Sequence, residues 1–152
     1  MNVADILAAK GARITSIKPS DTVQTLCQLL RERRVGAAVV SSDGSMINGI
    51  ITERDVSYAL AVHGDKLSSM PVSTFMTKEV VTCTPQDNAG RVASTMLSRN
   101  FRHIPVADHS DRLVGMVSIR DVLKERVAEL QQQTAQLRSL AAQSDSVLED
   151  RG

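Results

Sequence analysis

The chain has 152 residues, which is enough for one compact domain or for two small units that share a hydrophobic core. It contains no Trp, one Tyr and two Phe, and its formal net charge is +1, so it lacks the aromatic platforms and the concentrated positive charge of nucleic-acid-binding proteins. No segment reaches the ~18 consecutive apolar residues of a membrane span and the N-terminus lacks the apolar run of a signal peptide, which predicts a cytoplasmic protein without a membrane partner.

An internal repeat organises the chain. When the sequence is aligned with itself at an offset of 66 positions, residues 14–57 match residues 80–123 without a gap. The identical positions are mostly proline, glycine or charged residues: Pro19 and Pro85, Asp21 and Asp87, Arg33 and Arg99, Gly49 and Gly115, Arg54 and Arg120, Asp55 and Asp121. A duplication of this kind sets the architecture, because each copy can bury its apolar surface only against the other.

Both copies predict the same elements in the same order. An extended segment runs into a proline, and an aspartate (Asp21 or Asp87) then occupies the place of a helix N-cap. A helix follows, then an aliphatic strand, a polar turn, a second strand, and a second helix that opens at Thr52 or Ser118. The predicted strands are 14–17, 35–40 and 47–51 in the first copy and 80–83, 101–106 and 113–117 in the second.

The residues after the second copy predict a long helix. Apolar and small residues alternate in steps of four and three along this segment: Leu123, Val127, Leu130, Thr134, Leu137, Ala141, Ser144 and Leu148. This is a heptad pattern diluted by polar residues. It predicts a helix from about 119 through 140 or beyond that pairs with a second protomer or packs on a dimer, and a solvated tail is the alternative.

Two segments, 49–55 and 115–121, place a hydroxyl, an arginine and a carboxylate within four residues where a strand ends and a helix begins. Free N–H groups and the helix dipole attract anions at such a helix N-terminus. A carboxylate one turn into the helix can accept hydrogen bonds from a ribose diol. The alternative is purely structural: Thr52 and Ser118 cap their helices, and Asp55 and Asp121 complete capping boxes.

Four segments together resemble a tandem pair of cystathionine-beta-synthase-type (CBS) domains, called a Bateman module. They are Gly49–Asp55, Gly115–Asp121, Phe101–Val106 and Phe75–Val81. The resemblance covers roughly residues 10–126. It implies an α+β fold of two pseudo-symmetric strand-helix-strand-strand-helix repeats, about 10–62 and about 76–126, packed sheet to sheet. Residues 1–126 would form this CBS pair, and residues 127–152 would form a C-terminal helical extension.

The resemblance also implies two clefts that bind AMP, ADP, ATP, NAD(H) or S-adenosylmethionine. Asp55 and Asp121 would each hold a ribose beside Thr52 and Ser118, and Arg54 and Arg120 would face the phosphates. Arg102 and His103 match positions that contact phosphate or base in the cleft that contains Asp55, whereas their counterparts Gly36 and Ala37 are small and uncharged, which leaves equal filling of the two clefts open. The base pocket would be lined by Lys10, Gly11, Ala12, Thr77, Lys78 and Val80.

These features favour a ligand sensor over an enzyme. No glycine-rich phosphate loop or nucleophile motif is present in the sequence, and neither the three histidines nor Cys27 and Cys83 have metal-ligand spacing. We therefore expect no catalytic residue and no required metal. The prediction is a regulatory module that signals to an unidentified protein partner, and the resemblance implies that it is a homodimer. The alternative is a structural or oligomerisation module with vestigial clefts or one working cleft.

Overall fold

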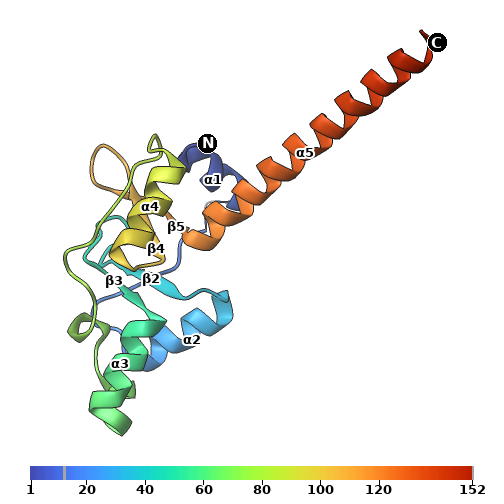
Figure 1. Ribbon diagram of the computed structural model, residues 1–152. Helices are drawn as coiled ribbons and strands as arrows, with labels where there is room; N and C mark the ends of the chain where they lie inside the picture. Colours follow the sequence, from blue (N-terminus) through green and yellow to red (C-terminus); the bar gives the residue numbers. More distant parts are fainter. Residues whose placement is uncertain (12, 152) are drawn as a thin grey trace.

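The structure, a computed structural model, describes residues 1–11 and 13–151. Figure 1 shows two small units of mixed helix and strand and one long helix that projects from them. The helices are α1 (Val3–Lys10), α2 (Val23–Arg33), α3 (Glu53–His63), α4 (Ala89–Arg99) and α5 (Ile119–Glu149), with 3₁₀ helices η1 (Gly64–Ser69) and η2 (Val72–Thr74). The strands are β1 (Ser16–Ile17), β2 (Ala37–Val40), β3 (Gly49–Thr52), β4 (His103–Ala107) and β5 (Leu113–Ser118). The predicted α+β fold is confirmed.

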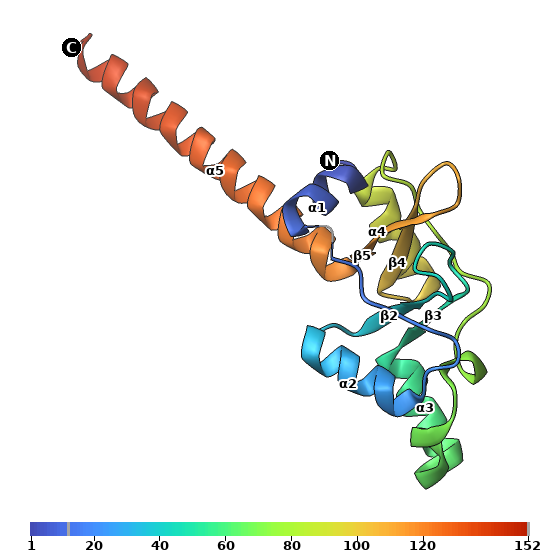
Figure 2. The same ribbon diagram turned by 180° about the vertical axis from the view of Figure 1, so that it is seen from behind.

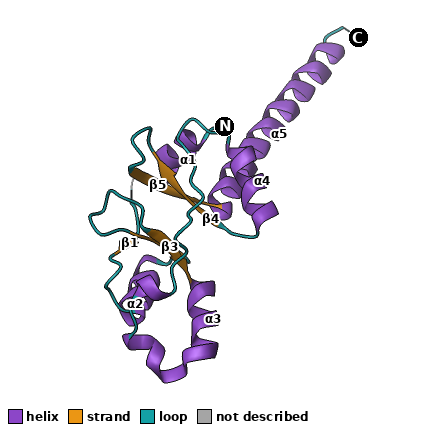
Figure 3. Ribbon diagram, turned by 90° about the vertical axis from the view of Figure 1, so that its left-hand side faces the viewer, coloured by secondary structure: helices purple, strands orange, loops and turns teal. Residues whose placement is uncertain are grey.

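Each repeat contributes one small sheet. In the first repeat, β1 pairs in parallel with β2, and β2 pairs antiparallel with β3. In the second repeat, β4 pairs antiparallel with β5, and the predicted strand at 80–83 is reduced to a single parallel bridge between Cys83 and Val106. The sheets lie next to each other (Figure 3), and the backbone N–H of Leu113 donates to the Ser45 carbonyl across the two hairpin turns at 2.8 Å.

The segment before each repeat packs on the other repeat. Val3 and Ile6 of α1 are buried in the core of the second repeat, and the Val3 N–H donates to the Asp87 carbonyl at 2.9 Å. Conversely, Val72 is buried in the core of the first repeat, and its N–H donates to the Asp21 carbonyl at 2.8 Å. Each hydrophobic core is therefore completed by a crossover, which ties the two repeats together.

The first helix of each repeat begins one residue later than the sequence predicts. The N-caps are Thr22 and Asn88, whose side chains accept the N–H groups of Thr25 and Arg91. Asp21 and Asp87 are not the caps: their carboxylates accept the N–H groups of Lys18 and Thr84 at 3.0 and 2.8 Å. The physical reason is that these carboxylates close the preceding turn around each proline, so the cap falls to the next polar residue.

The long C-terminal helix is confirmed. It runs without interruption from Ile119 to Glu149, and it lies beside α1 at its start before it leaves the rest of the fold (Figure 1 and Figure 2). Residues 130–151 are all exposed, including Leu137 at 67% and Leu140 at 61%. Among the described residues, no helix combines the length and apolar character needed to cross a bilayer.

Candidate functional site

The two hydroxyl-arginine-aspartate segments form the same local structure. The Thr52 N–H donates to Asp55 Oδ2 at 2.9 Å, and the Asp55 N–H donates to Thr52 Oγ1 at 3.3 Å. The corresponding distances for Ser118 and Asp121 are 2.9 and 3.1 Å. Both are capping boxes, as the structural alternative predicted.

Capping leaves acceptor capacity on both carboxylates. A carboxylate has two oxygens and about four lone-pair sites. In each capping box the N-cap N–H bonds Oδ2, and no hydrogen bond to Oδ1 occurs within residues 1–11 and 13–151. Asp55 and Asp121 are both half-buried. A helix cap and a ribose contact are therefore compatible in the same side chain.

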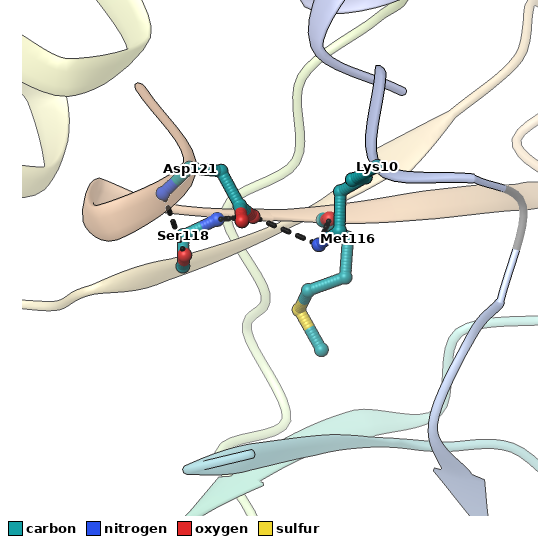
Figure 4. A network of polar contacts seen from close by, with 4 residues as sticks. All are labelled: Lys10, Met116, Ser118 and Asp121. Carbon is teal, nitrogen blue, oxygen red and sulfur yellow. Dashed lines mark hydrogen bonds and ion pairs between the residues drawn. The ribbon is translucent and has the colours of Figure 1, made fainter. Parts of the chain in front are cut away.

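Lys10 lies beside Ser118 and Asp121 of the second repeat. Its Nζ donates to Asp121 Oδ2 and to the Met116 carbonyl, both at 2.8 Å (Figure 4). Burial opposes ionisation of Asp121, but the hydrogen bonds from Lys10 and Ser118 outweigh it and hold the pKa of the carboxyl below its ordinary value. No lysine or arginine pairs with Asp55 in the part of the chain that the structure describes.

His103 lies between the two repeats. It begins β4 opposite Ser118, and its Cε1 would lie 3.5 Å from a Cβ placed on Gly36. Burial lowers the pKa of His103, the carboxylates of Asp121 and Glu53 oppose this shift, and the charges of Lys10 and Arg102 add to it. The lowered pKa favours the neutral imidazole, which can both donate and accept a hydrogen bond.

Glu53 is a residue that sequence reasoning missed. A Cβ on Gly36 would lie 3.2 Å from its Oε1, and its charge acts on His103. Its position between Thr52 and Arg54, inside segment 49–55, is the sequence signal that could have identified it.

Arg54 connects the two repeats. Its Nη1 donates to the carbonyl of Asn100, the C-cap of α4, at 3.1 Å. The accepting residue, Asn100, stands two positions before Arg102 in the sequence. Arg120 and Arg102 are exposed.

The predicted base-pocket residues divide between the two segments 49–55 and 115–121. Thr77 forms a two-way backbone bridge with Ile50 of β3, at 2.9 and 3.0 Å, so it lies beside the first motif as Lys10 lies beside the second. Val80 is half-buried, Gly11 and Lys78 are exposed, and Ala12 lies outside the described residues. Ala37 is 3% exposed inside β2, which leaves little of its side chain for a ligand. The structure thus groups Lys10, Ser118 and Asp121 on one side and Thr52, Asp55 and Thr77 on the other. His103, which the resemblance assigns to the Asp55 cleft, pairs with Ser118 and also lies near Gly36, and the charges of both Asp121 and Glu53 act on it, so it stands between the two groups.

Two cavities of the surface lie away from these carboxylates. A cavity of about 560 Å³ lies between residues 81–88 and α4, with Asp87 and Arg91 in its wall, and one of about 250 Å³ lies between α2 and α3. Neither cavity is lined by Asp55 or Asp121. No cluster of three or more His, Cys, Asp or Glu side chains is arranged to hold a metal ion among the residues described.

Comparison with known proteins identifies the repeats. The family model for the CBS domain matches the chain twice, at residues 3–62 and 72–128. A mitochondrial CBS domain-containing protein from Arabidopsis thaliana is 32% identical over 143 residues, which cover 89% of this chain and 69% of that protein. Among the curated relatives compared, the chain spans from 24% to 76% of their length.

Solved structures share the arrangement of the two repeats. A CBS-domain-containing protein from Agrobacterium tumefaciens superposes with a TM-score of 0.78 at 35% identity, covering 83% of this chain and 99% of that one. A CBS domain protein from Pyrobaculum aerophilum, solved in complex with AMP, gives a TM-score of 0.75 at 27% identity, covering 88% and 99%.

Proposed function

The chain belongs to the CBS-domain family, and we propose that it is a regulatory module that binds an adenosine-type ligand in its two clefts. One observation carries the proposal: the duplicated capping box places a half-buried carboxylate with a free oxygen at equivalent positions of both repeats. The AMP complex of the Pyrobaculum protein supports an adenosine ligand and makes AMP the first candidate among AMP, ADP, ATP, NAD(H) and S-adenosylmethionine.

The side chains around each cleft suit such a ligand. A carboxylate with a free oxygen can accept hydrogen bonds from a ribose diol, and the helix N-terminus beside it favours an anionic phosphate. Neutral His103 offers a hydrogen bond to a base or phosphate, and exposed Arg102 and Arg120 supply positive charge. Because the chain has two Phe, one Tyr and no Trp, aliphatic side chains and backbone would hold the adenine.

Titration calorimetry tests this proposal. The purified protein is titrated with AMP, ATP, NAD(H) and S-adenosylmethionine, and the titrations are repeated on Asp55→Ala and Asp121→Ala. Binding of one ligand that is weakened in either variant supports the proposal. Thr22→Ala, which removes the N-cap of α2, controls for the loss of helix capping and should bind like the wild type. Absence of binding for all four ligands, or binding that neither aspartate variant weakens, would favour a structural module with vestigial clefts.

A regulatory role without catalysis requires that the ligand bind one conformation better than another, so that a partner protein can read the difference. A cytoplasmic location and an unidentified protein partner remain part of the proposal. Incubation of the protein with AMP or ATP followed by chromatography of the nucleotides tests the non-catalytic part, and turnover that Asp55→Ala abolishes would contradict it.

The homodimer belongs to the same proposal, and α5 supports it. Most of the stability of a helix in a protein comes from packing of its apolar face, yet the Leu130 and Leu137 side chains of α5 are 46% and 67% exposed. A parallel pair would bury the seam that these residues share. In a Cys27→Ser background, Leu130→Cys should form a disulfide-linked dimer under oxidation, whereas Gln132→Cys, outside the seam, should not. Equal crosslinking of both variants would contradict a parallel seam.

A further inference from the structure

The two clefts differ in one charged side chain. Asp55 and Asp121 form equivalent capping boxes, but Asp121 Oδ2 also binds the ammonium group of Lys10 at 2.8 Å. The same ammonium donates to the Met116 carbonyl. At the equivalent place in the first repeat, the Ile50 carbonyl accepts the backbone N–H of Thr77 instead, which carries no net charge. The second cleft therefore contains a cation where the first has a neutral backbone group.

Lys10 is held in this position by the fold. Hydrogen bonds from the N–H groups of Val3 and Ala4 to the carbonyls of Asp87 and Pro85, at 2.9 and 2.8 Å, anchor α1 on the second repeat. Leu7 packs so closely on Gly115 that an added Cβ there would lie 2.7 Å from Leu7 Cδ2. One turn later, the Lys10 side chain crosses to β5 and the start of α5 (Figure 4). Its contact with Asp121 is thus set by the packing of α1, through buried Val3 and Ile6, on the second repeat.

A ligand that binds Asp121 lies next to the Lys10 ammonium and competes with it for the carboxylate. The ribose diol needs carboxylate acceptors, and Oδ2 is already shared by the Ser118 N–H and Lys10. The side chains of Lys10 and Asp121 are 32% and 21% exposed, so their charges are partly removed from water. A neutral ligand that bonds the free Oδ1 shares one carboxylate charge with the ammonium of Lys10, which weakens their charge-assisted hydrogen bond and gives the ammonium no new anionic partner. A phosphate beside the ribose offers the ammonium an anionic partner.

We propose that Lys10 makes the Asp121 cleft selective for adenosine ligands that carry an anionic group next to the ribose, and that the Asp55 cleft lacks this selectivity. The inference rests on the proposed function and names the ligand class of one of its two sites. Phosphorylated nucleotides are favoured there over adenosine and over the sulfonium cation of S-adenosylmethionine. The nearby guanidinium of Arg102 acts in the same direction, whereas the carboxylate of Glu53 opposes it.

The test isolates the second cleft and compares two ligands. Asp55→Asn removes the ribose-binding charge of the first cleft, and AMP and adenosine are titrated calorimetrically into this variant with and without Lys10→Met. Methionine keeps the length and apolar stem of lysine without its charge. In the Lys10→Met variant we expect AMP to bind more weakly and adenosine more tightly. The ratio of their Kd values should change by about tenfold, which corresponds to about 1.4 kcal/mol.

Two controls keep the outcomes separate. Lys66→Met removes an exposed lysine from η1, outside the residues assigned to either cleft, and should leave the ratio unchanged. Lys10→Gln, a second neutral variant, should reproduce Lys10→Met, and thermal unfolding confirms that both are folded. If Asp55→Asn binds AMP and the ratio of the AMP and adenosine Kd values is the same with and without Lys10→Met, the selectivity is refuted while the proposed function stands. If the wild type binds neither ligand, the proposed function fails, and the selectivity fails with it.

Discussion

Replacing Gly49 by alanine tests how tightly the segment between the repeats packs on the first repeat. A Cβ at Gly49 would lie 2.7 Å from Met76 Sδ and 2.9 Å from the Thr77 carbonyl oxygen. The Met76 side chain can move, but the Thr77 carbonyl is backbone and accepts the Ile50 N–H at 3.0 Å, so the segment itself must shift. Overpacking costs about 1–3 kcal/mol and alanine recovers about 0.5–1 kcal/mol of chain entropy, so we expect unfolding to become easier by about 1–2 kcal/mol.

Gly115→Ala is the matched control, since it stands at the equivalent position of the second repeat. A Cβ there meets atoms of the Leu7 side chain alone, with Cδ2 at 2.7 Å and Cδ1 at 3.1 Å. The branched end of leucine can rotate away, so the expected loss is below about 1 kcal/mol. Urea denaturation followed by circular dichroism measures the free energy of unfolding of both variants. The packing argument is refuted if Gly49→Ala is as stable as the wild type, or if Gly115→Ala loses more.

Three further predictions concern titratable groups. Burial raises the pKa of the Cys83 thiol to about 12, so iodoacetamide at pH 8 should label exposed Cys27 in the native protein and leave Cys83 unmodified, and equal labelling would contradict this. Burial lowers the pKa of His103 from 6.5, so the unfolded chain binds more protons near that pH, and the free energy of unfolding should fall as the pH drops through it. Because Lys10 contributes to this lowering, Lys10→Met should raise the His103 pKa in an NMR titration of its imidazole, and an unchanged value would show that the two charges do not interact.

Much of the fold follows from local information in the sequence. The gap-free offset between the copies predicts equivalent elements, and the hydroxyls of Thr52 and Ser118 mark the helix starts that the structure confirms. These features depend on residues within one turn of each other, so a sequence pattern contains them. The same holds for α5, whose length follows from an uninterrupted run without proline or glycine.

The contacts that shape the candidate site are not local. Lys10 and Asp121 are 111 positions apart, and they meet because α1 crosses to the second repeat and packs in its core. Arg54 finds its partner at Asn100 for a similar reason, since it reaches the end of a helix in the other repeat. Periodicity reports which face of an element is buried but not which neighbour buries it. The difference between the two clefts was therefore visible in the sequence only as the small residues Gly36 and Ala37.

The central claim is that the two motif carboxylates bind an adenosine ligand, and equilibrium dialysis against labelled AMP tests it most directly. The wild type is compared with the double variant Asp55→Asn/Asp121→Asn, whose asparagine side chains can still accept the capping hydrogen bonds. We predict that the wild type retains AMP and that the double variant loses this binding while its thermal midpoint stays close to that of the wild type. Undiminished AMP binding by a folded double variant would contradict the account.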